Sequence, residues 1–414
     1  MPSTPRTCTV LTLGTAQTLA WASTYYLPAI LAVPMARDLG INAATVFAAF
    51  SAGLVISAFL GPRAGRAIDS FGGRPVLAFS NLVFAMGLTA LGFASGRWSL
   101  FAAWMVIGMG MAGGLYEAAF ATLVRLYGRD SRNVITGITL IAGFASTVGW
   151  PLSTALEAWM GWRNTCFVWA GLHVLLGLPL NLSLPRLWSE KAGQAKQLPE
   201  DAATATATAN VSTHITPSVS AAPTVPLRSA VLLALVFALT WFISTAMAAH
   251  LPTLLTASGV SLSMAVTAGA LIGPAQVAGR LLEFGVLRRA HPLLSARIAA
   301  VMHPLGAIAL AVLGAPAAML FALLHGAGNG VLTIAKGTLP LALFGPQGYG
   351  ERQGLLMVPA RLAQALAPWL FALCMERLGA GALWVSAALG ALVFVALAML
   401  SQPSADSASP PEER

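Results

Sequence analysis

Twelve long apolar segments restrict what this chain can fold into more than any other feature of its sequence. Each is near or above the roughly 20 residues that a helix needs to cross the bilayer core. Runs of this length do not fit the roughly 10-residue alternating segments of a membrane barrel. The sequence therefore predicts an all-α membrane protein. The segments lie at roughly 9–35, 43–63, 75–95, 98–126, 133–157, 164–184, 229–254, 260–282, 293–314, 316–345, 352–375 and 380–400.

The charged residues are few, and their placement excludes several classes of protein. Only 9% of the chain is charged, against about a quarter of an ordinary globular domain. The formal net charge is +9, but the arginines occupy short joints between apolar segments, so we expect no nucleic-acid partner. The three cysteines are far apart, and no spacing suggests a metal, a catalytic nucleophile or a phosphate-binding loop. We therefore expect neither an enzyme nor a cofactor.

Lys and Arg predict the orientation in the membrane. If the N-terminus is cytoplasmic, sixteen of them fall on the cytoplasmic side and four on the outer side. Positive loops stay in the cytoplasm, so this asymmetry favours two cytoplasmic termini and an even number of spans. The expected location is the inner (cytoplasmic) membrane, with a multi-pass topology.

One segment belongs to no span. From Ala192 to Pro226 the chain is rich in Ala, Thr, Ser and Pro and has no aromatic residue. Such a composition cannot bury enough apolar surface to fold, which predicts a disordered linker. The expected organisation is an N-terminal six-helix bundle (1–186), a cytoplasmic linker (187–228), a C-terminal six-helix bundle (229–402) and a tail (403–414).

The two six-span parts repeat one another. The joint after the second span carries Gly65, Arg66, Asp69 and Arg74, and the joint after the eighth carries Gly279, Arg280, Glu283 and Arg288 at an offset of 214. The triplet "YLP" that begins at Tyr26 matches "HLP" at His250, and "YGRD" at Tyr127 matches "YGER" at Tyr349. Three matches in the same order indicate two parallel, pseudo-symmetric halves.

With its six-plus-six layout, the chain resembles the major facilitator superfamily of secondary transporters. The signature of that family lies between spans two and three, where Gly65, Asp69, Gly72 and Arg74 match it. Ser70 and Gly73 replace residues that are usually basic. The resemblance implies alternating access of a central cavity that spans 1, 4, 7 and 10 line.

The charged joints have two interpretations. An acid at a membrane edge can accept hydrogen bonds from Arg and from helix N-terminal amides of the facing half. The joints would then act as a cytoplasmic gate, with residues Gly65, Arg66, Asp69, Gly72 and Arg74 in the first copy and Gly279, Arg280, Glu283 and Arg288 in the second. Alternatively, they are only positive topology signals.

Three charges lie deep inside predicted spans, where an isolated ion costs about 2.5–3.5 kcal/mol. Glu117 and Lys336 fall at similar depth in the counterpart spans 4 and 10, so they could face each other across a transport path. A purely structural ion pair is the alternative. Arg361 in span 11 could bind an anion or extend to the cytoplasmic edge.

Uncharged polar and aromatic residues complete the candidate site. Those that suit a ligand cavity or proton exchange are Gln17, Trp21, Tyr25, Tyr26, His250 and Asn329. The two tyrosines could instead belong to an interfacial belt. His173, His303 and His325 read as packed or hydrogen-bonded histidines.

These residues favour a secondary active transporter for a small organic solute, with protons as the expected coupling ion. The excess of Lys336 and Arg361 over Glu117 favours an organic anion such as a carboxylate. The alternatives are an exporter of drugs, toxic compounds or metalloids and, more remotely, a membrane sensor or scaffold. The expected partners are the lipid bilayer, the solute and protons, with the protein acting as a monomer.

Overall fold

The computed structural model describes residues 6–185 and 226–401, which are helical almost throughout. The predicted linker and tail fall largely outside these residues. The first half contains α1 (Arg6–Ser23), α2 (Pro28–Asp38), α3 (Ala43–Phe71), α4 (Gly73–Gly92), α5 (Arg97–Gly114), α6 (Tyr116–Tyr127), α7 (Ser131–Ala142), α8 (Ala145–Leu172), a π-helical turn (His173–Gly177) and α9 (Leu178–Leu182). The second half contains α11 (Leu227–Ala257), α12 (Leu262–Gly285), α13 (Pro292–Leu313), α14 (Ala318–Phe344), α15 (Tyr349–Leu378) and α16 (Ala382–Ala398).

These helices make twelve membrane spans, as the sequence predicts. Within the described residues, nine mainly helical stretches are long and apolar enough to cross a membrane, and two of them contain more than one span. The run Arg97–Leu182 contains spans four to six, and Tyr349–Ala398 contains spans eleven and twelve. Positive-φ glycines divide these stretches at Gly128, Gly161 and Gly379, where an L side chain would be strained.

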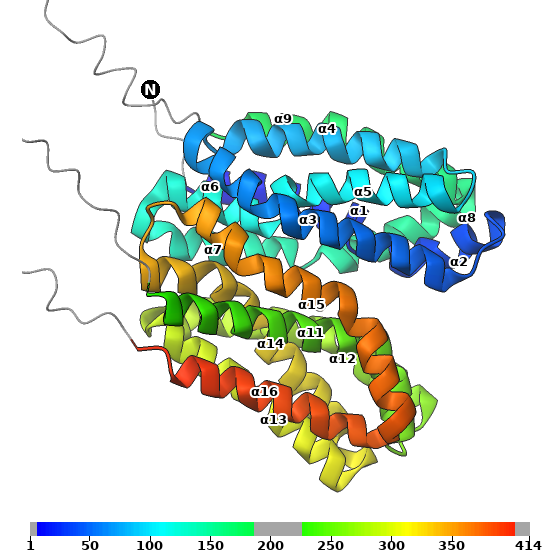
Figure 1. The fold of residues 1–414 in the computed structure, drawn as a ribbon, viewed down its shortest axis with the longest axis vertical. Helices are drawn as coiled ribbons and strands as arrows, with labels where there is room; N and C mark the ends of the chain where they lie inside the picture. The colour runs from blue at the N-terminus through cyan, green and yellow to red at the C-terminus, as the bar shows by residue number, and fades with distance from the viewer. Residues whose placement is uncertain (1–5, 186–225, 402–414) are drawn as a thin grey trace, which may run out of the picture.

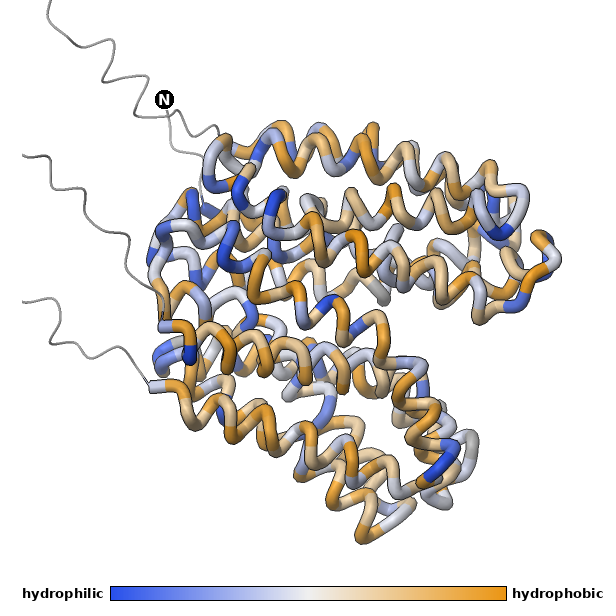
Figure 2. The backbone as a smooth tube through the Cα atoms, in the orientation of Figure 1, coloured by the Kyte–Doolittle hydropathy of each residue, from blue (hydrophilic) through white to orange (hydrophobic). Residues whose placement is uncertain are grey.

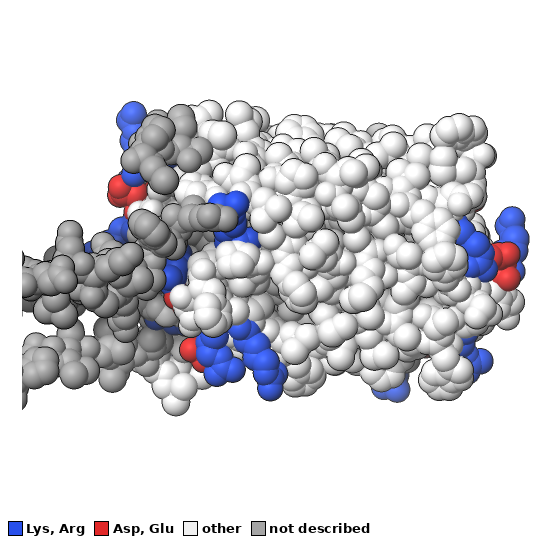
Figure 3. Space-filling model, turned by 90° about the horizontal axis from the view of Figure 1, so that it is seen from above, with Lys and Arg blue, Asp and Glu red and all other residues white. Residues whose placement is uncertain are grey.

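The surface agrees with a bilayer environment. Acidic and basic side chains gather at the two ends of the molecule, and the wide band between them is almost free of charge in the view of Figure 3. The hydrophobic stretches of the backbone fill the same band in Figure 2. We call the end where α1 and α11 begin the terminal end, and the opposite end the far end.

The two halves are arranged side by side, and they lie closest at the terminal end (Figure 1). There, α3 packs against α15, while α7 packs against α12 and α14. Towards the far end, the ribbons of the two halves diverge, with α2 and α8 on one side and α13 and α16 on the other. Among the described residues, the hydrogen bonds between the halves reach from the terminal end as far as Ser51, whose Oγ donates to the Ala365 carbonyl at 3.3 Å.

Two helix ends differ from the sequence-based boundaries in ways that matter for the site. The second span was expected to end near residue 63, but α3 continues to Phe71, so Asp69 lies in its last turn. The residues after 63 favour a helix although they are polar, and the helix ends only where Gly72 adopts φ +87°. The fourth span is interrupted, because Leu115 is extended between α5 and α6.

Candidate functional site

The indole of Trp241 in α11 is the centre around which the deep charges gather. Lys336 Nζ lies 4.0 Å from the centroid of its ring, and Arg361 Cζ lies 5.4 Å from it. Both cations are buried, with 6% and 3% of their surfaces exposed. A cation over an indole face is attracted by the ring quadrupole, and more strongly where water is excluded.

Glu117 forms an ion pair with Arg361 rather than with Lys336. Arg361 Nη2 in α15 donates to Glu117 Oε2 in α6 at 2.9 Å, and Arg361 Nη1 donates to Gln364 Oε1 at 3.0 Å. The pair therefore links the two halves. Lys336 Nζ has no ion pair or hydrogen bond within the described part of the chain.

The break in the fourth span determines the position of Glu117. Because α6 begins at Tyr116, Glu117 lies in its first turn, where the positive end of the helix dipole stabilises a carboxylate. The break leaves the Gly114 carbonyl near the middle of the membrane, and Gln17 Nε2 donates to it at 2.8 Å. Gln17 therefore supports the local structure that holds Glu117.

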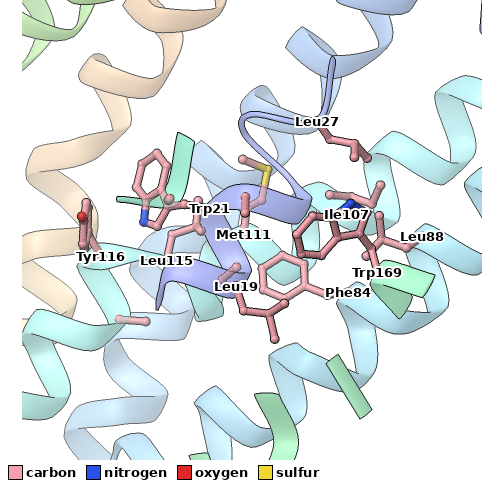
Figure 4. Close-up of a cluster of buried hydrophobic side chains, with 14 of the residues drawn as sticks. Leu19, Trp21, Leu27, Phe84, Leu88, Ile107, Met111, Leu115, Tyr116 and Trp169 are labelled. Carbon is pink, nitrogen blue, oxygen red and sulfur yellow. The ribbon is translucent and has the colours of Figure 1, made fainter. Parts of the chain in front are cut away.

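Aromatic side chains of the first half also pack against Trp241. Trp21 is nearly parallel to it, with ring centroids 6.2 Å apart and an angle of 4°. Tyr25 packs against both indoles, and Tyr26 packs against Tyr25 and Trp150. Trp21 and Tyr116 are neighbours at one edge of a buried cluster (Figure 4), with centroids 4.8 Å apart.

Several hydrogen-bond donors of this centre are unused. The buried Nε1 atoms of Trp21 and Trp241 and the buried Nε2 of Gln364 have no partner among the described residues. Buried polar groups are normally paired, so these three donors are each able to receive an acceptor. The centre therefore combines two buried cations, one carboxylate and three unpaired donors among the described residues.

Two of the predicted candidates lie elsewhere. His250 is nine residues beyond Trp241 in α11, about 13 Å along the helix, and its Nε2 bonds to the Pro368 carbonyl at 2.7 Å. Asn329 is seven residues before Lys336 in α14 and donates through Nδ2 to Ser244 Oγ at 3.1 Å, inside the second half. Neither contacts the charges around Trp241.

The first charged joint contacts the opposite half directly. Asp69 Oδ1 and Oδ2 accept from the backbone amides of Gly350 and Glu351, at 3.0 and 2.8 Å. These amides are the orphan donors of the first turn of α15. Arg66 lies 3.4 Å from the carboxylate of Glu351, and Gly65 packs against the backbone of Gly350.

The other members of this joint act within their own half. Gly72 provides the positive φ that ends α3, and Arg74 forms no ion pair with any described residue. The joint is therefore a direct contact at Asp69, Arg66 and Gly65, and a turn at Gly72.

The second joint uses a different partner. Arg132, at the start of α7, donates through Nη2 to Glu283 Oε1 at 2.7 Å and through Nη1 to the Ala290 carbonyl at 2.6 Å. The Arg280 guanidinium lies against Gly143 of the first half, and Gly279 packs on Ala327 within the second. The side chain of Arg288 lies outside the described residues.

Sequence reasoning missed two residues at these contacts. Trp241 could have been found, because the offset of 224 between the Tyr26 and His250 triplets carries Gln17 onto it. Arg132 could have been found from its place at the start of span five, the counterpart of the start of α15. Both signals become visible only when the sequences of the two halves are aligned with each other.

Two bundles of six membrane helices, with a buried charged centre between them, define a multi-pass membrane protein built to carry a solute. The family model of the Major Facilitator Superfamily matches residues 13–324. The chain belongs to this superfamily, whose members are transporters and not enzymes.

Solved structures with the same fold cover nearly all of the chain. The human organic anion transporter MFSD10 (TETRAN) superposes with a TM-score of 0.67 at 17% identity, covering 95% of this chain and all of that one. The E. coli fucose:proton symporter FucP gives 0.69 at 13% identity, with 95% and 98% covered. The proton:xylose symporter XylE gives 0.69 at 13% identity, with 94% and 95% covered. At these identities the similarity establishes the fold alone.

One curated relative is similar in sequence over part of the chain. It is an uncharacterized 38 kDa protein in the 23S RNA operon of Thermoproteus tenax, 28% identical over 156 residues. The match spans 37% of this chain and 40% of that protein. It adds no information on the substrate.

Proposed function

We propose that this protein is a secondary active transporter of a small organic anion, such as a carboxylate, and that protons are its coupling ion. The observation that carries the proposal is the charge balance at Trp241, where Lys336 and Arg361 face one carboxylate, Glu117. Burying an unbalanced cation is costly, and an anionic ligand would remove that cost.

The contacts suggest how binding and proton uptake are linked. Lys336 Nζ has no hydrogen bond or ion pair with a described residue and contacts the ring of Trp241. It can therefore receive the anion first. The anion then competes with Glu117 for Arg361, because both are oxygen acceptors for the same guanidinium. Once Arg361 turns to the substrate, Glu117 is a buried carboxylate without its cation, and it takes up one proton to become neutral.

The gate follows from the first joint. With the N-terminus in the cytoplasm, the terminal end is the cytoplasmic face, and Asp69 closes it by capping α15. Release of this cap, together with the Arg132–Glu283 contact, would let the halves rock and open the centre to the cytoplasm. The state described by the structure is then one with its cytoplasmic side closed.

The fold neighbours do not decide the substrate. One is named an organic anion transporter and two are sugar symporters, so the same architecture accepts both classes. The argument for an anion therefore depends on the charges at Trp241.

A proteoliposome assay tests the proposal. Purified protein should accumulate labelled mono- or dicarboxylates under an imposed pH gradient. Lys336→Ala should weaken binding by about 10- to 100-fold, the equivalent of a lost charge-assisted hydrogen bond of about 1.5–3 kcal/mol. Lys336→Arg, which keeps the charge, should retain part of the affinity.

Arg377→Gln is a matched control, because Arg377 is exposed at the far end of the helix that carries Arg361. It should transport like the wild type. Transport of neutral solutes in preference to carboxylates, or full affinity in Lys336→Ala, would contradict the proposed substrate class.

A further inference from the structure

Two histidines of the second half form a buried pair away from the charged centre. His303 in α13 and His325 in α14 approach through their Nδ1 atoms at 2.9 Å. They are 7% and 4% exposed. Phe321 lies parallel to the ring of His325 and edge-on to that of His303, with centroids 5.8 Å away in both cases. The aromatic contacts hold both rings in fixed orientations.

A small cavity adjoins this pair. Its volume is about 30 Å³, enough for a water molecule, which needs about 10–15 Å³. Both histidines line it, together with three other polar residues, Thr240, Ser244 and Asn329. A buried water typically makes two to four hydrogen bonds, and residues of this kind can supply them. No residue lining the cavity carries a formal charge or an ionisable group other than the two imidazoles.

The bonding of the pair leaves one ring nitrogen ready to accept a proton. In a neutral pair, one Nδ1 must donate and the other must accept. The donating ring then carries no hydrogen on its Nε2. His303 Nε2 is buried and has no hydrogen-bond partner among the described residues. Protonation of the free Nε2 preserves the Nδ1–Nδ1 hydrogen bond and strengthens it, because the donor becomes charged.

The third buried histidine provides a contrast. His173 in the first half has both ring nitrogens occupied, by Ser23 Oγ at 2.7 Å and by Asn81 Oδ1 at 2.9 Å. It lies outside the lining of the cavity. A histidine bonded in this way stabilises packing and has no free nitrogen for a further proton.

We propose that His303, His325 and the adjoining cavity form a proton-binding site inside the second half. A hydronium ion in the cavity transfers one proton to the free Nε2 and remains as water, and the two imidazoles share the resulting charge through their Nδ1 atoms. Ser244 and Asn329 place this site on α11 and α14, the helices that carry Trp241 and Lys336. Along these helices, Ser244 lies about one turn from Trp241 and Asn329 about two turns from Lys336, while His325 lies about three turns from Lys336.

This inference deepens the proposed function, because it gives the coupling ion a second binding position besides Glu117. Proton binding itself does not depend on which solute is carried. Only the link between the imidazole pair and transport depends on the proposed function.

The nitrogen NMR spectrum of the histidines tests proton binding without a substrate. Protein labelled with ¹⁵N-histidine, in lipid nanodiscs, is titrated between about pH 5 and 8, where imidazole charge normally changes. The chain has six histidines, so the signals of the pair are first assigned with single-histidine variants. The imidazolium signals assigned to His303 and His325 should appear in the wild type, disappear in His325→Gln and remain in His173→Gln. A pair that stays neutral over this range would overturn the proposal.

A variant that retains both rings covers the case in which His325→Gln does not fold. Asn329→Leu replaces a polar cavity wall by an apolar side chain of similar size. The imidazolium signal at a given pH should shrink, because the water that delivers and solvates the proton is excluded. An unchanged signal in correctly folded Asn329→Leu would argue against the role of the cavity.

Transport then tests the coupling. In proteoliposomes, accumulation driven by a pH gradient should fall at least about tenfold in His325→Gln, the effect of one pH unit of driving force, and much less in His173→Gln. Equal accumulation by the two variants would refute the coupling. Absence of carboxylate transport by the wild type would contradict the proposed function while leaving the NMR titration valid.

Discussion

Arg361 holds Glu117 at 2.9 Å across the boundary between the halves, and this contact makes Glu117 the sharpest test at the scale of single residues. Glu117→Gln keeps the shape and removes the charge. We expect the variant to exchange substrate across the membrane but to lose accumulation driven by a pH gradient, because it cannot take up the coupled proton. Exchange and accumulation measured on the same proteoliposomes check this expectation.

Two further variants separate the coupling role from a structural ion pair. Glu376→Gln, at an exposed site of α15, should behave like the wild type. The double reversal Glu117→Arg with Arg361→Glu should restore folding and transport if the pair only holds the halves together. Full accumulation by Glu117→Gln alone would eliminate the proton role.

The sequence identified the charged residues of the centre but not their pairing. Glu117, Lys336 and Arg361 stand out because buried charges are rare in membrane spans. The matching depth of Glu117 and Lys336 suggested that they face each other, whereas the partner of Glu117 is Arg361. The sequence predicts how deep a residue lies along its helix. It does not predict which way the helix is rotated about its axis, nor the break at Leu115. Both arise from packing between helices that are apolar on nearly every face.

At the scale of elements, the closest approach of the two halves depends on glycines in α3 and α15. A Cβ at Gly65 would collide with the carbonyl oxygen of Gly350, a backbone atom that cannot move alone. We therefore expect Gly65→Ala to push α3 and α15 apart and to favour the state that is open at the terminal end. Gly273→Ala is the control, because a Cβ at this helical glycine of α12 has no neighbour within 4 Å.

Spin labels on exposed side chains measure this change. Phe71 and Val286 are 76% and 65% exposed at the terminal ends of opposite halves. The distance between labels at these positions should increase in Gly65→Ala and stay constant in Gly273→Ala. Asp69→Asn should act in the same direction, since loss of a charged cap costs about 1 kcal/mol, roughly a fivefold change in population. Unchanged distances in both variants would contradict a gating role of the first joint and favour its interpretation as a topology signal.

The elements themselves were largely predictable. Twelve apolar runs correspond to twelve spans because a helix satisfies its backbone hydrogen bonds within one segment, and runs of this length do not suit a barrel. The extension of α3 to Phe71 was missed, since hydropathy ends where the charges begin while helical hydrogen bonding continues to the next glycine. The interruption at Leu115 was also missed. It is stabilised by Gln17, which is nearly one hundred residues away in sequence.

At the scale of the whole molecule, the connection between the halves should be dispensable for transport. Both α9 and α11 end or begin at the terminal end (Figure 1), and the residues between them have a composition that does not support a folded core. Deletion of residues 195–222 should leave transport within about twofold of the wild type, because the remaining residues still span a short distance. Uptake per inserted molecule checks the prediction, with membrane insertion measured separately.

Loss of transport by correctly inserted deletion protein would show that the connection helps to shape the site. The organisation of the chain as two repeated halves makes this outcome unexpected. Each half has its own buried hydrophobic clusters, with few residues shared between them. The halves therefore meet as preformed bodies, which is also what rocking requires.

The cap that closes the terminal end has a genetic consequence. The groups that Asp69 holds are peptide N–H groups, and these remain in place whatever side chain stands at position 351, with proline as the exception. A screen for variants that leave this end open should therefore return many different substitutions at Asp69. At Glu351 it should return mainly proline. Position 351 is thus robust to point mutation, whereas position 350 is not, because a Cβ at Gly350 would meet the carbonyl oxygen of Gly65 and the carboxylate of Asp69. The same screen should therefore return substitutions at Gly350 and Gly65 beside those at Asp69.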